Sequence, residues 1–175
     1  NLEDAKLRIS KIGFPVVLKP VDNAGSRGVS KITNMEESHK AFEFAKQFSR
    51  CGDVLVEEYI DGEEVAVDGF ILDNKLHILC VSDKIRTPPP YLLDTTVIFP
   101  SNRPLPIIKQ ICEITSKACL AMGINNSPIH AELMISRKGP VVMEIAARGA
   151  GFKVYTHILP MVTGVDTLKT QINLS

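Results

Sequence analysis

The chain has 175 residues, 45% of them hydrophobic, which suits one globular domain or two small lobes that share a core. Its 20 basic and 20 acidic residues cancel, which argues against a broad electrostatic surface for nucleic acid or for an anionic membrane. No apolar run approaches the roughly 20 residues of a membrane span. The four cysteines lack metal-type spacing, so we expect them to be reduced core residues of a cytoplasmic protein.

The first part of the chain predicts a helix and then two short strands joined by a loop of small residues. Residues 2–9 are helix-like, Phe14–Lys19 is an apolar strand, and residues 28–32 resume a strand. The loop contains Ala24, Gly25, Ser26, Arg27 and Gly28. Small residues let backbone N–H groups approach an anion, and Lys19 would add a positive charge at the edge of the loop. The alternative is an ordinary hairpin with polar turn residues.

A helix over residues 36–50, capped by Asn34, precedes a strand over residues 54–60. This strand ends in Glu57, Glu58, Tyr59 and Ile60. Exposed backbone in such a strand can pair with the edge of a purine. A carboxylate seven residues after Glu57, that of Glu64, is placed to bind ribose hydroxyls.

The remaining residues predict a second lobe that is richer in hairpins. Residues 64–72 and 76–82 form one hairpin, and residues 83–106, with Pro88-Pro89-Pro90, predict an extended loop over a site. A helix over residues 107–122 follows, and residues 155–172 are mostly helical. We therefore expect an α+β fold with mainly antiparallel strands and two lobes, residues 1–60 and 61–175.

Glu132 and Glu144 lie twelve residues apart in two apolar strands, residues 129–135 and 141–147, around a polar turn with Gly139-Pro140. Pairing around that turn would bring the two carboxylates opposite each other. Buried carboxylates repel unless a proton or cation lies between them, and hard oxygen ligands suit magnesium or manganese. The alternative is a pair of glutamates on a wet face, each beside a lysine or arginine.

One competing metal signature is excluded. His130-Ala131-Glu132 matches the first half of the zinc deaminase motif, but the Pro-Cys-x-x-Cys that completes the motif is missing. No Gly-x-Ser-x-Gly segment indicates a hydrolase nucleophile.

The order of these motifs resembles the ATP-grasp family, nearest to its biotin carboxylase, carbamoyl-phosphate synthetase and amino-acid ligase branch. The resemblance covers nearly the whole chain and is sharpest over residues 13–29, 56–69 and 130–151. It implies that ATP lies between two α+β lobes and phosphorylates a carboxylate or bicarbonate. An amine, ammonia or thiol then attacks the acyl phosphate. The expected protein is thus an ATP-dependent ligase that forms C–N bonds from small carboxylate and amine substrates.

The resemblance also assigns roles to individual residues. Lys19 would hold the α- and β-phosphates, and the loop Ala24–Gly28 would close over the β- and γ-phosphates. Glu57 and the backbone of Glu58, Tyr59 and Ile60 would meet adenine, and Glu64 the ribose. Glu132 and Glu144 would hold magnesium, Arg148 would neutralise the transferring phosphoryl group, and Lys84 falls where some relatives place a substrate-site lysine.

Two departures from the family pattern leave alternatives open. The family often has asparagine two residues after the second glutamate, where this chain has Ala146, so the number of metal ions is open. The family also has an N-terminal domain upstream of residue 1, which we expect as a partner from the same protein, and the resemblance leaves a homodimer open. Bicarbonate phosphorylation of the carbamoyl-phosphate synthetase type, a nucleotide-binding module without catalysis and a domain with no ligand are the competing interpretations.

Overall fold

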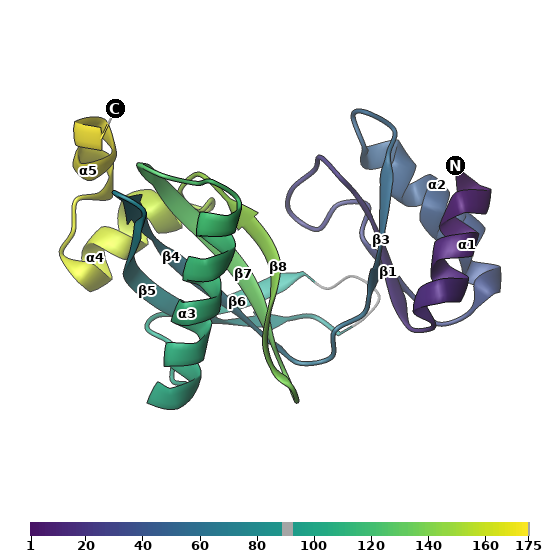
Figure 1. Ribbon diagram of the computed structural model, residues 1–175, viewed down its shortest axis with the longest axis horizontal. Coiled ribbons are helices and arrows are strands. Elements are labelled where there is room, and N and C mark those ends of the chain that lie inside the picture. Colours follow the sequence, from purple (N-terminus) through teal and green to yellow (C-terminus); the bar gives the residue numbers. More distant parts are fainter. Residues whose placement is uncertain (89–92, 175) are drawn as a thin grey trace. The chain divides into compact units, whose positions relative to one another are not determined.

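The computed structural model describes residues 1–88 and 93–174, and it divides into two compact units (Figure 1). The first unit comprises Asn1–Ile60 and Arg86–Thr95, and the second comprises Asp61–Ile85 and Thr96–Ser175. Both units are α+β with antiparallel strand pairing, as predicted. The functional roles expected of the two lobes stay predictions.

The first unit is a three-stranded sheet with two helices on one face. Its elements are α1 (Leu2–Ile12), β1 (Val16–Pro20), β2 (Ser30–Ile32), the 3-10 turn η1 (Met35–Glu37), α2 (Ser38–Phe48) and β3 (Val54–Glu58), and the strand order is β2-β1-β3. Alternate residues of β1, Val16 and Leu18, pack with Ile9 of α1 and Phe42 of α2. The intervening residues of β1, including Lys19, therefore lie on the face that the two helices leave open.

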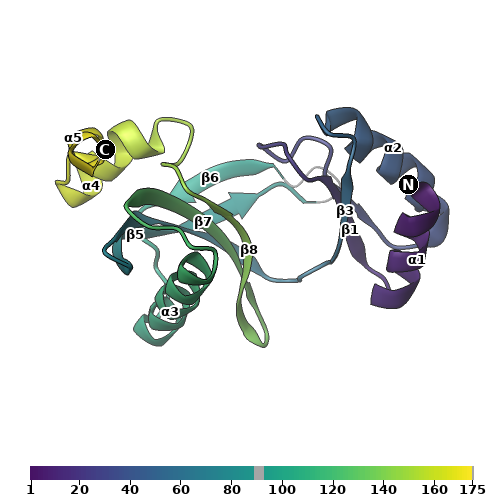
Figure 2. The ribbon, with the colours of Figure 1, turned by 45° about the horizontal axis from the view of Figure 1, so that its top comes forward.

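The second unit is a larger sheet in the order β6-β5-β4-β7-β8. Its elements are β4 (Glu63–Leu72), β5 (Lys75–Arg86), β6 (Asp94–Ile98), α3 (Leu105–Ala121), β7 (Ser127–Ser136), β8 (Gly139–Ala146), the π-helical segment η2 (Val154–Ile158), α4 (Leu159–Thr163) and α5 (Thr167–Leu174). The last residue of β5 and the first two of β6 belong to the first unit. Figure 2 shows α3 along one face of this sheet. No helix in the described ranges combines the length and apolar content that crossing a bilayer requires.

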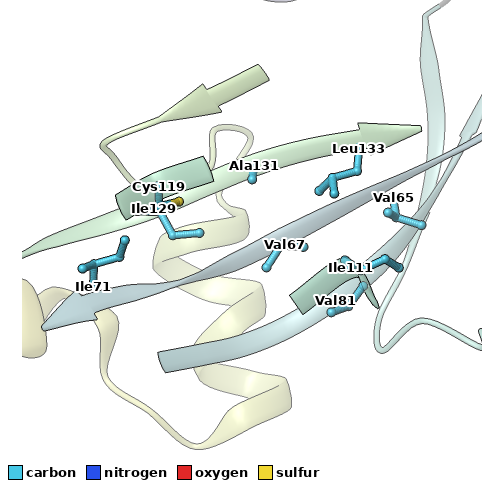
Figure 3. Close-up of a cluster of buried hydrophobic side chains, with 9 residues drawn as sticks. All are labelled: Val65, Val67, Ile71, Val81, Ile111, Cys119, Ile129, Ala131 and Leu133. Atoms are coloured by element: carbon cyan, nitrogen blue, oxygen red, sulfur yellow. The ribbon is translucent and has the colours of Figure 1, made fainter. Parts of the chain in front are cut away.

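The two faces of the larger sheet differ in chemistry. Val65, Val67, Val81 and Leu133 point toward α3 and form, with Ile111, part of the main core (Figure 3). Because side chains alternate along a strand, the neighbours of these residues point to the other face. Over that face the C-terminal helices cover one end through an apolar cluster of four buried residues, Phe70, Cys80, Tyr155 and Leu159. The rest of the face carries ionisable side chains.

Residues 83–106 are not one extended loop, and that expectation is wrong. Strand β5 continues to Arg86 and β6 begins at Asp94, while Pro89, Pro90 and their two successors lie outside the described residues. Asp83, inside β5, accepts hydrogen bonds from the Ser101 hydroxyl at 2.7 Å and from the backbone N–H of Asn102 at 2.9 Å. A run of prolines sets where strand pairing stops, but the β-favouring residues beside it still pair.

One cysteine departs from the expected core location. Cys51 is exposed in the turn after α2, whereas Cys80 and Cys119 are buried, and all four cysteines are free thiols.

Candidate functional site

The open face of the first sheet gathers two lysines, a carboxylate and an aromatic ring. The Lys19 ammonium lies 2.7 Å from a carboxylate oxygen of Glu57 on the neighbouring strand. The Lys31 ammonium, on β2, lies 3.7 Å from the centre of the Tyr59 ring, a cation–π contact. Both ion partners of the Lys19–Glu57 pair remain partly exposed, so this cation can exchange its partner for a ligand at low cost.

The loop between β1 and β2 has an anchored base and an exposed tip. The Asp22 carboxylate accepts hydrogen bonds from the backbone N–H groups of Arg50 and Cys51 and from the Ser49 hydroxyl. These bonds lower the pKa of Asp22, the Arg50 bond most, against the opposing effect of burial. Residues Ala24–Arg27 are exposed, and the Arg27 guanidinium folds back on the carbonyl of Ala24.

Gly28 closes this loop under the side chain of Phe48. A Cβ added at Gly28 would lie 2.9 Å from the Cβ of Phe48, and the residue has φ +79°. Any side chain here is therefore disfavoured both by contact and by backbone conformation. The end of the loop at Gly28 is therefore held against α2 at a position that only glycine fits.

Strand β3 presents an edge with alternating backbone groups. The backbone N–H of Tyr59 donates to the carbonyl of Pro15 at 3.1 Å, so it is already used within the unit. In an antiparallel ladder the intervening residues point their N–H and C=O groups away from the partner strand. Glu58 and Ile60 therefore point their backbone groups outward, because β3 is the edge strand of the described three-stranded sheet.

The polar face of the second unit carries a buried group of charges centred on Lys84. The Lys84 ammonium lies 2.6 Å from Oε1 of Glu64 on β4 and 2.6 Å from Oε1 of Glu132 on β7. Lys84 and Glu64 are almost fully buried, and Glu132 is partly exposed. Carboxylate oxygens of Glu64 and Glu132 lie within 4.8 Å of each other, which requires a cation near both.

His130 extends the same group toward β4. Its Nδ1 lies 2.9 Å from Oδ1 of buried Asp68, which is directly opposite in the strand register, and its Nε2 lies 3.5 Å from Oε1 of Glu132. Burial lowers the pKa of His130, but the two carboxylates outweigh it and raise the pKa to about 9. Burial likewise raises the pKa of Glu132, yet His130 and Lys84 together lower it to about 2.

Glu132 and Glu144 are paired across β7 and β8, as predicted. The pairing depends on a β-bulge. Near the turn Leu133 lies opposite Val142, and the register shifts by one residue between Leu133 and Glu132, so that Met143 is the extra residue of the bulge. Without that extra residue Glu132 would face Met143. The expectation that both glutamates are buried is wrong for Glu144, which is exposed.

The oxygens at this pair fit a hard divalent cation. Both cationic contacts of Glu132 go to Oε1, and within residues 1–88 and 93–174 neither Oε2 of Glu132 nor the Glu144 carboxylate has a hydrogen bond or ion pair. Two available carboxylates opposite each other provide the oxygen ligands that magnesium prefers. Ala146 lies directly opposite His130 in the register and adds no ligand.

Arg148 lies in the loop just after β8, four residues beyond Glu144, and its side chain is exposed. Its guanidinium donates to the carbonyl of Gly149 at 2.9 Å. A Cβ on Gly149 would lie 2.2 Å from the ring of Tyr155, so the backbone rests directly on that buried ring. The Tyr155 hydroxyl in turn donates to the carbonyl of Thr167 at 3.0 Å.

The structure brings several predicted site residues together and adds others. Lys19 contacts Glu57, and Lys84 joins Glu64 to Glu132. Arg148 makes no described contact with either glutamate, and the ribose role of Glu64 stays a prediction, since its carboxylate is buried against Lys84. Three residues were missed by sequence reasoning, Lys31, Asp68 and His130. Asp68 and His130 could have been found from strand alternation. Asp68 lies on the same face of β4 as Glu64, and His130 lies on the same face of β7 as Glu132.

Comparisons with known proteins show to which family this chain is similar. The family model for the ATP-grasp domain matches residues 12–156. Alanine–anticapsin ligase of Bacillus subtilis strain 168 is 28% identical over 95% of this chain and 39% of its own length. Dapdiamide A synthase of Enterobacter agglomerans is 33% identical over 79% of this chain and 34% of its own length. The chain thus spans well under half of these relatives.

A solved structure adds a likeness in three dimensions. The biotin carboxylase domain of Hydrogenobacter thermophilus 2-oxoglutarate carboxylase, solved with MgADP and bicarbonate, is 26% identical. It aligns with a TM-score of 0.81 over 99% of this chain and 39% of that chain. The likeness therefore extends over both units of the chain.

Proposed function

The chain belongs to the ATP-grasp family, and from that premise we propose that it is the ATP-binding part of a ligase that joins a carboxylate to an amine through an acyl phosphate. The observation that carries the proposal is the pairing of Glu132 with Glu144 beside Lys84. The relative named alanine–anticapsin ligase supports an amino acid as one of the substrates. A cytoplasmic location and a homodimer are further parts of the proposal.

On the first unit, Lys19 and the loop Ala24–Gly28 are assigned to the phosphates. Lys19 leaves Glu57 to meet the phosphate charge, and the exposed backbone N–H groups of the loop tip bind oxygens. Lys31 offers a second ammonium on the same face. The outward carbonyl of Glu58 and outward N–H of Ile60 form an acceptor and donor pair that complements the edge of adenine.

On the second unit, Glu132 and Glu144 are assigned to magnesium, which when bound offsets negative charge on the phosphates. The Arg148 guanidinium is assigned to the phosphoryl group in transit, because a planar fork can contact two oxygens at once. Lys84 is assigned to the carboxylate substrate or the acyl phosphate, and its pairing with Glu132 keeps its ammonium at a fixed place in a buried setting.

The proposed reaction balances in two steps. A carboxylate oxygen of the substrate attacks the γ-phosphorus, the bond to the β,γ-bridging oxygen breaks, and ADP leaves. The amine nitrogen then attacks the acyl carbon, the carbon–oxygen bond to phosphate breaks, and the ammonium proton is lost. The residues position these groups and stabilise charge, which is most of what phosphoryl transfer requires.

Two alternatives have specific support. The likeness to a biotin carboxylase solved with bicarbonate favours bicarbonate as the phosphoryl acceptor. Ala146, where the family often has a metal-binding asparagine, favours a nucleotide-binding module without turnover. ATP-dependent phosphate release by the complete protein, assayed with pooled amino acids and separately with bicarbonate, distinguishes the three.

The metal assignment has its own test. Glu144→Gln in the complete protein is expected to abolish magnesium-dependent turnover and leave the fold intact, since the exposed side chain supports no described contact. Glu113→Gln, on α3, is the control and should keep full activity. A Glu144→Gln protein with normal turnover would refute the assignment.

A further inference from the structure

The Asp68–His130 pair has no role in the assignments above, yet it is built into the polar face of the larger sheet. Asp68 on β4 is almost fully buried, and His130 lies opposite it on β7. His130 and Glu132 are two residues apart on one strand, so their side chains share a face. The ring therefore connects a buried carboxylate to the glutamate assigned to the metal.

The two oxygens of Glu132 are treated differently by the chain. Oε1 faces both Lys84 at 2.6 Å and Nε2 of His130 at 3.5 Å. Oε2 has no partner among the residues that the structure describes. One oxygen is thus held by the protein, and the other is left for a ligand.

His130 is itself fixed in place from the opposite side. Its Nδ1 contacts Oδ1 of Asp68 at 2.9 Å, and a ring held at one nitrogen has a defined direction at the other. Its neighbour across the strands is Ala146, whose small side chain leaves room for the ring. The family often has an asparagine at the position of Ala146. In this chain the polar side chain of the pair is His130, on the neighbouring strand.

We propose that His130, oriented by Asp68, is a positioning residue that holds Oε1 of Glu132 so that Oε2 faces the metal ion. The inference rests on the proposed function, which makes Glu132 a metal ligand. Carboxylates and imidazoles bound to metals are commonly oriented by such outer partners, and loss of one partner typically weakens metal binding roughly 10- to 100-fold.

A purely structural role would give His130 a different signature. If the ring served only to compensate buried Asp68, any side chain that donates to Asp68 would replace it. Asparagine places its amide N–H near the position of Nδ1 and has nothing at the position of Nε2. Glutamine places its amide near Nε2 instead. The two variants therefore separate the contact with Asp68 from the contact with Glu132.

The test measures Mn2+ binding to the complete protein in the presence of a non-hydrolysable ATP analogue. The electron paramagnetic resonance signal of free Mn2+ reports how much of the ion is unbound. His130→Asn is expected to bind Mn2+ about 10-fold more weakly. His130→Gln is expected to recover most of the affinity. His77→Asn, at an exposed position of β5, is the matched control and should bind as the wild type does.

Turnover gives a second readout. In His130→Asn the magnesium concentration for half-maximal rate should rise, while the rate at saturating magnesium falls much less. A His130→Asn protein with wild-type Mn2+ affinity overturns the proposal. Should that variant fail to fold, His130→Gln decides, because loss of Mn2+ affinity in this variant overturns the proposal equally.

Glu132→Gln in the same titration separates the two levels of inference. Unchanged Mn2+ binding in Glu132→Gln refutes the metal assignment in the proposed function. Weaker binding in Glu132→Gln together with normal binding in His130→Asn refutes only the positioning role.

Discussion

The two units hold their cations in opposite ways. In the first unit the Lys19 and Glu57 side chains form a single ion pair and are 22% and 31% exposed. In the second unit the Lys84 and Glu64 side chains are 7% and 6% exposed and join a longer series of charges that includes Glu132. Each unit has a lysine that pairs with a glutamate on a neighbouring strand, but only Lys84 is almost fully buried.

Under the proposed function, we infer that the first unit serves binding and the second unit serves chemistry. An exposed pair is screened by water and contributes little to stability, so its lysine is free to take a phosphate as a new partner. A buried series of charges fixes geometry, and removing one member leaves the others uncompensated. We therefore expect substitutions in the first unit to change affinity and those in the second to change stability and rate.

The strongest way to break this comparison is Lys84→Met. Removing the ammonium takes the shared cation away from buried Glu64 and partly exposed Glu132, so we expect the free energy of unfolding to fall by about 3–5 kcal/mol. Urea unfolding followed by circular dichroism measures it.

Two further variants check the cause of that loss. Lys75→Met, at an exposed position of the same strand, should unfold like the wild type. Adding Glu64→Gln to Lys84→Met should restore part of the stability, because it removes one of the two carboxylates that Lys84 contacts. A Lys84→Met protein as stable as the wild type would show that the enclosed lysine is not needed for folding.

Arg148→Lys tests the second unit at the level of rate. A lysine keeps the charge but cannot contact two oxygens in a plane, so we expect turnover to fall roughly 10²-fold. Nucleotide affinity, measured by calorimetry on the complete protein, should stay unchanged because Lys19 and its loop lie in the other unit. Equal loss in rate and affinity, or loss in neither, would contradict a role confined to the transition state.

Lys19→Met should do the reverse. We expect nucleotide affinity to fall about 10-fold, the size of one charge-assisted contact, while unfolding free energy changes by less than about 1 kcal/mol. Lys6→Met, which removes another exposed ion pair of the same unit, is the control and should leave affinity intact. A large loss of stability in Lys19→Met would remove the contrast between the units.

The smallest expected effect is in hydrogen exchange. Backbone amides of Ala24–Gly28 should exchange fast without ligand and slow several-fold with a non-hydrolysable ATP analogue, since order there depends on the anion. Amides of β7 should be protected in both states. Protection of Ala24–Gly28 that already matches β7 without ligand would show that the tip needs no anion to become ordered.

Much of the fold could be predicted from the sequence, because the hydrophobic periodicity and the turn-forming residues agree with the structure. Strand β1, the hairpin at Asp73-Asn74 and the helix after residue 104 follow directly from alternation, turn residues and helical spacing. The stretch around Pro88 could not be predicted, because proline marks where pairing is interrupted but not whether the flanking residues pair again with each other.

The candidate site was predictable for residues close in sequence and not for those joined by the sheet. Glu132 and Glu144 could be paired from one hairpin, although the bulge that aligns them has no sequence signal of its own. Asp68 and His130 lie 62 residues apart, and their contact depends on the pairing of β4 with β7, which local pattern does not specify. The order of strands in the sheet joins residues that are far apart in sequence, which turn signals and periodicity do not encode.

Gly149 and Tyr155 share one volume, and this has a consequence for how the sequence can vary. The ring fills the space that a side chain at position 149 would need, so the two positions can change only together. Gly149→Ala alone would make the new methyl group clash with the Tyr155 ring. The same change together with a smaller residue at position 155 would let the methyl group occupy the space that the ring leaves. Sequence change at position 155, in the helical segment that follows, is thereby constrained by the loop that carries Arg148.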